Sequence, residues 1–126
     1  MKARLSNARI SPKKMNLVAG LIRRADVNKA AQLLKFTNKK AAGILLKLLE
    51  SAIANAVNNF DQKRDELIID EIKVTKGSTY TRAMPASRGR SNPIKKVNSH
   101  VTFFLKAQTV VKKAAKKTAE KAAVTQ

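Results

Sequence analysis

The residues of this chain best suited to chemistry are cationic, and many of them lie between residues 74 and 101. This stretch reads VTKGSTYTRAMPASRGRSNPIKKVNSHV and contains no aspartate or glutamate. Its basic side chains are Lys76, Arg82, Arg88, Arg90, Lys95 and Lys96. The planar guanidinium of arginine binds phosphate oxygens in pairs and stacks on bases, and lysine supplies a compact positive charge. The cluster therefore predicts binding to a polyanion.

The same stretch predicts a long β-hairpin, from about residue 76 to 98. Both of its ends read as strand, and Pro85, Gly89 and Pro93 interrupt the middle. We interpret Gly89 as a turn residue, because it lacks the strand–turn–helix setting of a phosphate loop. Arms of roughly 13 residues would reach ~40 Å, which exceeds the radius of so small a domain. An isolated two-stranded ribbon is marginal in water, so we expect the outer half to need a partner.

A second basic group lies near the N-terminus. Ser11 followed by Pro12 is a helix-start signal, with the serine expected to cap the helix. Lys13 and Lys14 then fall in the first turn, where positive charge opposes the helix dipole. A phosphate would offset this cost by pairing with the lysines and with the free N–H groups.

No constellation of residues indicates catalysis, a metal site or a cofactor. The chain has no cysteine, and His100 is its single histidine. We interpret His100 as a structural or RNA-contacting side chain. The acidic residues Asp65, Glu66, Asp70 and Glu71 fall in a predicted loop and on the edge of a predicted strand, where successive side chains face opposite sides. They are therefore interpreted as solvated surface residues and not as a metal site or an acid/base pair. The sequence therefore predicts a protein that is not an enzyme.

Charge is unevenly distributed along the 126 residues, which carry a net charge of +19. Residues 1–25 and 72–126 have net charges of +7 and +12, whereas residues 26–71 are neutral. This pattern predicts an ordinary core with two cationic surfaces, typical of nucleic-acid binding. The aromatic residues, 4% of the chain, are too few for a base-stacking platform. The apolar stretch from Ala41 to Leu49 is shorter than a membrane span and no signal peptide is evident, which favours a soluble intracellular protein.

The predicted elements make an α+β fold in which three helices cover one face of a three-stranded antiparallel sheet. We expect a strand over Lys2–Ile10, helices from Ser11 to about Arg24, from Asp26 to Phe36 and from Lys39 to Asn59, and two strands from Leu67 onward. Asp26, and Thr37 or Asn38, are expected to cap the second and third helices. The predicted apolar stripes include Met15, Val18, Ile22, Leu17 and Leu21 in the first helix and Phe60 at the end of the third. We assign residues 1–106 to a single domain and residues 107–126 to a basic Lys/Ala-rich tail.

Several motifs together resemble the family of bacterial large-subunit ribosomal protein twenty-two. They are SPKK before a helix, KFTNKKAA leading into SAIANA, a basic hairpin ending in P-x-x-x-G-R, and S-H-V-T in the last strand. The resemblance covers roughly residues 3–106 and leaves out the tail. It implies a cytoplasmic, non-catalytic constituent of the large ribosomal subunit, whose hairpin threads among domains of the 23S rRNA toward the nascent-peptide exit tunnel.

The resemblance also implies which residues contact the RNA. Carried over by position, they are Arg9, Ser11, Lys13, Lys14, Arg82, Arg88, Gly89, Arg90, Lys95, Lys96 and His100. The hairpin tip, formed by Met84, Pro85, Ala86, Ser87 and Arg88, would line the tunnel wall. The implied partners are 23S rRNA, neighbouring large-subunit proteins and the nascent peptide, with no membrane and no homo-oligomer.

Another class of function stays open at this point. A DNA-bending architectural protein also uses basic β-arms, and Pro85 or Pro93 could act as a wedge between base pairs. Such proteins generally dimerise through helices, whereas the helical stripes here are predicted to be used by one sheet.

Overall fold

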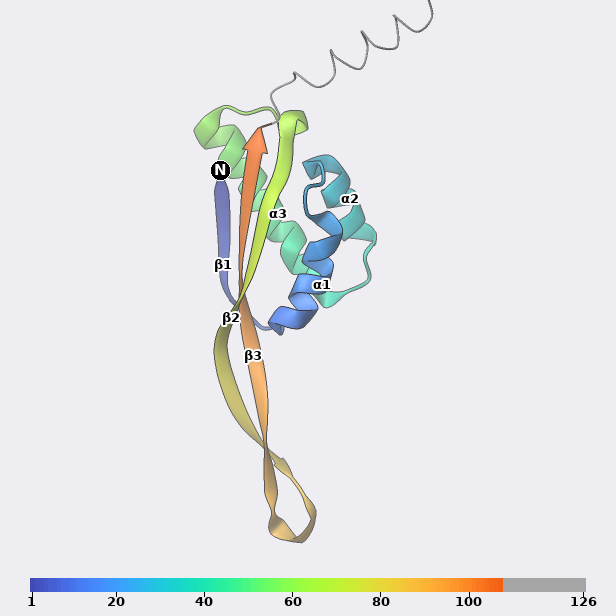
Figure 1. The fold of residues 1–126 in the computed structure, drawn as a ribbon, viewed down its shortest axis with the longest axis vertical. Helices are drawn as coiled ribbons and strands as arrows, with labels where there is room; N and C mark the ends of the chain where they lie inside the picture. Colours follow the sequence, from blue (N-terminus) through green and yellow to red (C-terminus); the bar gives the residue numbers. More distant parts are fainter. Residues whose placement is uncertain (108–126) are drawn as a thin grey trace, which may run out of the picture.

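The central strand of the sheet is the last one in the sequence. In a computed structural model, which describes residues 1–107, three strands lie antiparallel in the order β1-β3-β2. Their bounds are Lys2–Ala8 for β1, Leu67–Pro85 for β2 and Ser91–Ala107 for β3. Figure 1 shows β2 and β3 continuing past the body as a long hairpin. The predicted α+β fold with a protruding hairpin is confirmed.

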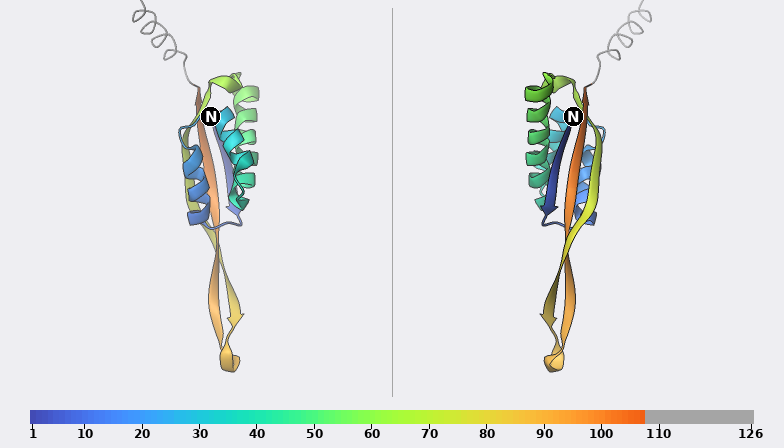
Figure 2. Two further views of the ribbon diagram at one scale, coloured as in Figure 1. Left: turned by 90° about the vertical axis from the view of Figure 1, so that its right-hand side faces the viewer. Right: turned by 90° about the vertical axis from the view of Figure 1, so that its left-hand side faces the viewer.

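The three helices lie on one face of the sheet, as predicted (Figures 1 and 2). They are α1 (Pro12–Ile22), α2 (Val27–Phe36) and α3 (Lys40–Phe60). A short 3-10 turn, η1 (Arg64–Glu66), precedes β2, and another, η2 (Ser87–Gly89), closes the hairpin. The predicted tail from residue 108 onward lies outside the described residues.

Helix α3 supplies the largest share of the helical side of the core. Its buried residues are Ala41, Ala42, Leu45, Leu48, Leu49, Ala52, Ile53 and Ala56. They pack with Val101, Phe103 and Leu105 of β3 in one apolar cluster. Helix α3 has 21 residues, so its apolar segment extends beyond the Ala41–Leu49 stretch noted in the sequence. By length and composition alone, the helix could cross a membrane. Its buried stripe identifies it as a core helix.

Two predicted apolar stripes were wrong at particular residues. In α1, Leu17 and Leu21 are exposed, and Ala19 is buried instead with Met15, Val18 and Ile22. A 3.6-residue period places the two leucines on the flank away from the sheet. Phe60, expected on the buried side of α3, is 55% exposed because it is the last residue of the helix.

The side chains of β2 do not alternate regularly at the start of the strand. Ile69 is buried, whereas Ile68 is only partly so, because the pairing with β3 shifts between Ile69 and Glu71. One extra residue in a strand reverses the facing of every side chain before it. On β3, the polar residue Asn98 is buried.

The predicted helix caps do not form. Ser11 and Asp26 occupy the N-cap positions of α1 and α2, yet neither side chain makes a capping hydrogen bond. The Asp26 carboxylate lies 3.0 Å from Lys29 Nζ instead. The N-cap of α3 is Lys39, and Thr37 Oγ1 donates to the carbonyl of Leu33 at the end of α2. These N-termini are therefore without side-chain acceptors.

The outer hairpin has no core of its own. Every residue from 78 to 96 is exposed, although the two strands stay paired as far as Pro85 and Ser91. At the tip, Arg88 (φ 58°) and Gly89 (φ 70°) adopt left-handed conformations, and the Ala86 N–H donates to the Arg90 carbonyl at 2.8 Å. The interpretation of Gly89 as a turn residue is confirmed.

Gly77 is required by close packing where the hairpin leaves the body. The pairing of β2 with β3 shifts between Lys76 and Thr79, so the strand is irregular at this glycine. A Cβ atom on Gly77 would lie 3.2 Å from Asn7 Oδ1, 3.2 Å from His100 Nε2 and 3.3 Å from the backbone carbon of Asn98.

We predict that Gly77→Ala lowers the free energy of unfolding by about 1–3 kcal/mol, because the added methyl group overpacks this site. Gly43→Ala is the matched control. Gly43 lies within α3, and a Cβ atom added to it would have no neighbouring atom within 4 Å, so this change should stabilise by about 0.5–1 kcal/mol. Urea unfolding of both variants measures the difference. Equal midpoints for the two variants would contradict the packing role of Gly77.

Candidate nucleic-acid interface

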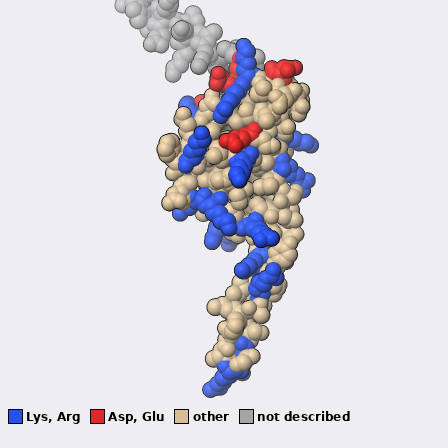
Figure 3. Space-filling model, turned by 180° about the vertical axis from the view of Figure 1, so that it is seen from behind, with Lys and Arg blue, Asp and Glu red and all other residues tan. Residues whose placement is uncertain are grey.

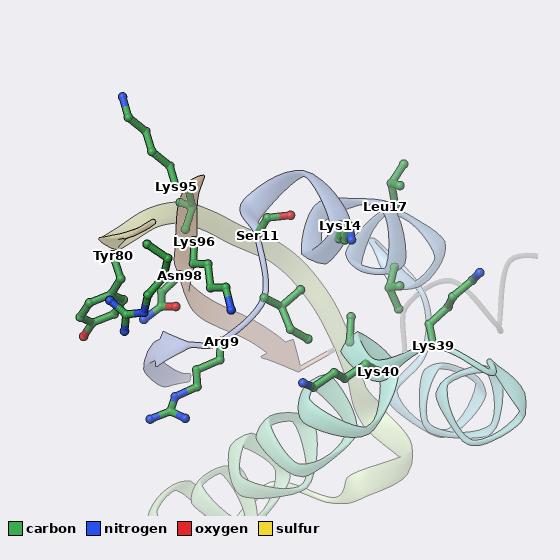
Figure 4. Close-up of a pocket in the computed structure, with 15 residues that line it drawn as sticks. Arg9, Ser11, Lys14, Leu17, Lys39, Lys40, Tyr80, Lys95, Lys96 and Asn98 are labelled. Carbon is green, nitrogen blue, oxygen red and sulfur yellow. The ribbon is translucent and has the colours of Figure 1, made fainter. Parts of the chain in front are cut away.

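A cationic groove lies at the neck, which we define as the place where the hairpin leaves the body. It is lined by Arg9, Lys14, Lys39, Lys40, Arg82, Lys95 and Lys96, with Ile10, Ser11, Leu17, Val18, Ala41, Tyr80, Val97 and Asn98. Seven of these residues are basic and none is acidic. Figure 4 shows that they come from the β1–α1 loop, helix α1, the start of α3 and both arms of the hairpin. The groove therefore joins segments that are distant in sequence.

Two helix N-termini also point their positive ends at this groove. Ser11, the N-cap of α1, and Lys39 and Lys40 at the start of α3 line it together. Neither helix has a side-chain cap or an acidic residue in its first turn. Free N–H groups and the dipole at such an end favour an anion. The backbone thus adds to the positive potential of the seven side chains.

The groove is large enough to hold part of an extended ligand. Its volume is about 1140 Å³, which exceeds the ~300–1,000 Å³ typical of small-molecule pockets. Part of its wall is apolar, from Ile10, Leu17, Val18 and Val97. A polyanion with flat apolar faces between its charges, such as RNA, fits this combination.

The acidic residues lie away from the neck. On the face seen in Figure 3, the Asp and Glu side chains lie on the part of the body farther from the hairpin, while Lys and Arg continue along the hairpin. Lys29, Lys73 and Lys106 pair with Asp26, Glu71 and Asp70, in the part of the chain described, and none of these lysines lines the groove. Within the described residues, the cations of the groove form no salt bridge, so they can bind an anion from outside the protein.

The structure brings together most of the predicted RNA-contacting residues of the body and the inner hairpin. Arg9, Ser11, Lys14, Arg82, Lys95 and Lys96 line the one groove, although the sequence suggested two separate surfaces. Lys13 is exposed in the first turn of α1, beside the groove but not lining it. Arg88, Gly89 and Arg90 lie at the far end of the hairpin, with the tip residues Met84 to Arg88.

Sequence reasoning missed four polar residues of the groove, in addition to the apolar residues of its wall. Lys39 and Lys40 belong to a segment whose charges sum to zero, so composition concealed them. The motif KFTNKKAA, just before the longest helix, was the available signal. Tyr80 and Asn98 carry no charge, and only the pairing of the two hairpin arms reveals that they lie near each other.

His100 has a structural contact inside the protein. Its Nδ1 accepts a hydrogen bond of 3.0 Å from the backbone N–H of Asn7, a residue with a left-handed backbone (φ 55°). The pairing of β1 with β3 shifts at this point, between Leu5 and Ala8. His100 therefore provides an acceptor that the irregular strand end lacks.

We predict that His100→Ala lowers the free energy of unfolding by about 0.5–1.5 kcal/mol, because the Asn7 N–H loses its partner. His100→Gln should retain most of the stability, since its side-chain oxygen can accept the same hydrogen bond. Thermal or urea unfolding measures both. If His100→Ala unfolds at the wild-type midpoint, the hydrogen bond contributes no stability.

The chain is similar to known ribosomal proteins over the part that forms the sheet, the helices and the hairpin. The family model for ribosomal protein L22p/L17e matches residues 3–106. A large ribosomal subunit protein uL22 from Metamycoplasma arthritidis is 51% identical over 102 residues, covering 81% of this chain and 48% of the relative. The uL22 proteins of Fusobacterium nucleatum and Thermus thermophilus are 46% and 44% identical over 94 and 104 residues. These alignments cover 75% and 82% of this chain, and 85% and 92% of the two relatives.

Proposed function

The chain belongs to the ribosomal protein L22p/L17e family and is a structural constituent of the large ribosomal subunit, and from this premise we propose how it acts there. It binds 23S rRNA through the neck groove and the hairpin, and it holds segments of that RNA in position during assembly. Its role is structural rather than catalytic. The neighbouring proteins of the large subunit are its further partners.

The groove is the observation that carries this proposal. Seven cations and two uncapped helix ends face one space with no acidic residue among the lining side chains. Their mutual repulsion is unfavourable until a polyanion replaces the surrounding counterions. The β1–α1 loop, α3 and the hairpin all contribute to the groove, so an RNA bound there would contact the body and the hairpin together.

The hairpin extends the same binding deeper into RNA. Its outer residues, 78–96, are all exposed, and its acid-free sequence gives no internal compensation for Arg82, Arg88 and Arg90. Burial among RNA segments would supply the packing and the counter-charge that the ribbon lacks. We propose that the tip, residues 84–88, then reaches the wall of the exit tunnel and lies beside the nascent peptide.

A DNA-bending role is the weaker explanation. It would use the hairpin as an arm with Pro85 as a wedge. Membership of a ribosomal protein family argues against it, and the groove joins the hairpin to the body, which a separate arm would not require.

We predict that the affinity for transcribed 23S rRNA falls steeply as the salt concentration rises, and that Lys39 and Lys40 in the groove account for part of this salt dependence. Changing both lysines to glutamine should reduce the magnitude of the log–log salt slope by ~0.7–0.9 for each phosphate that the variant no longer neutralises. Filter binding across a salt series measures this slope.

The matched control for this prediction is the double variant Lys29→Gln with Lys106→Gln. It removes the same charge, but both lysines pair with aspartates outside the groove. Its salt slope should remain close to wild type. If both double variants change the slope equally, binding follows net charge and the groove has no special part in it.

We predict that a photo-crosslinker in place of Arg88 attaches to 23S rRNA in cells, and in translating ribosomes also to the nascent peptide, because the tip projects away from the body. Sequencing of the attached nucleic acid and mass analysis of attached peptides measure this. A crosslinker at Asp65, in η1 at the end of the body away from the hairpin, should yield far less of either. Recovery of chromosomal DNA from the Arg88 position would contradict the proposed function.

A further inference from the structure

Asn98 is a largely buried residue whose carboxamide is accessible from the neck groove and has no partner among the described residues. Only 6% of its surface is exposed, yet it lines the groove. Its carboxamide makes no hydrogen bond within the described residues 1–107. The carboxamide is still accessible from the groove, because within the described residues the buried side-chain atom that has no hydrogen bond is Ser99 Oγ. A ligand in the groove could therefore pair with a donor and an acceptor that no other side chain in the described residues uses.

The surroundings of Asn98 suit one nucleotide. Figure 4 shows Tyr80, Lys96 and Arg9 around it on the same side of the hairpin base. Tyr80 pairs with Lys96, which lies two residues before Asn98 in β3, and Tyr80 is about half exposed. The guanidinium carbon of Arg82 lies 5.7 Å from the centre of the Tyr80 ring. An aromatic face, an accessible amide and flanking cations therefore lie together.

The chemistry of these groups distinguishes a base from a phosphate. A phosphate has acceptors only and pairs best with Arg9 and Lys96. A carboxamide presents a donor and an acceptor side by side, which matches the edge of a nucleobase. An exposed tyrosine ring can stack on the face of that base. Too few aromatic residues are present for a stacking platform, but one ring is enough for one base.

We propose that Asn98 and Tyr80 form a pocket for a single unpaired nucleotide of the bound RNA. Tyr80 stacks on the base, Asn98 pairs with its edge, and Arg9 and Lys96 bind the adjoining phosphates. This inference rests on the proposed function, because it names the RNA feature that the neck groove selects. Paired bases in an A-form helix cannot enter, since their edges and faces are already occupied.

The test uses the full chain and three RNA hairpins that differ at one place in the stem. The first carries a single unpaired nucleotide, the second an abasic site at that position, and the third is fully paired. We expect the first to bind about tenfold more tightly than the other two, which is the scale of stacking one base on one aromatic ring. All four bases are tried in the unpaired position.

Three variants connect this preference to the pocket. Tyr80→Leu should abolish the preference for the unpaired nucleotide, and Tyr80→Phe should retain it, because the ring is kept. Asn98→Val, which fills the same space without hydrogen-bonding groups, should reduce the preference with little change in salt slope. Tyr80 is half exposed, so its variants test the pocket even if Asn98→Val folds poorly.

The outcomes separate this inference from the proposed function. A preference that disappears in Tyr80→Leu and is kept in Tyr80→Phe supports the pocket. If the three RNAs bind equally and with strong salt dependence, the groove contacts phosphates alone and the pocket is overturned, while RNA binding stands. If none of them nor 23S rRNA binds in a salt-dependent manner, both are overturned.

Discussion

Electrostatic repulsion at the neck is the constraint on which the rest of this structure depends. Seven cations line one groove, and the helix ends that meet there add positive potential instead of reducing it. Stability must therefore come from elsewhere in the free protein, and the apolar cluster between the sheet and the three helices supplies it. The apolar core therefore stabilises the fold, while the charged neck is available for binding.

Much of the fold follows from local sequence patterns. The i, i+3, i+4, i+7 spacing of Val27, Ala30, Ala31 and Leu34 predicts the buried face of α2 correctly. The exposure of Leu17 and Leu21 could not be predicted. The five apolar residues of α1 form a wide stripe, and only the position of the sheet decides which part of that stripe is buried. The facing of Ile69 depends on a bulge that has no glycine or proline to mark it.

The candidate site was predictable where charge is dense and hidden where charge is balanced. Arg9, Lys14, Arg82, Lys95 and Lys96 lie in acid-free segments, and the structure gathers them in the groove. Lys39 and Lys40 share a segment with seven acidic residues, so a sum over sequence cancels charges that the fold separates in space. Opposite charges within one segment neutralise each other only if they come close together, because screening limits exposed pairs to about 10 Å.

The bulge at Gly77 connects the geometry of the hairpin with that of the groove. Gly77 approaches His100, Asn7 and the backbone of Asn98, so its lack of a side chain sets how closely the two arms pack at the neck. The Asn98 side chain and Tyr80 lie just beyond this point, on the same two strands. A change in the bulge would move the hairpin relative to α1 and α3, and it would also change the separation between the amide and the ring. The direction of the hairpin and the shape of the groove are therefore linked, because both depend on the close packing at Gly77.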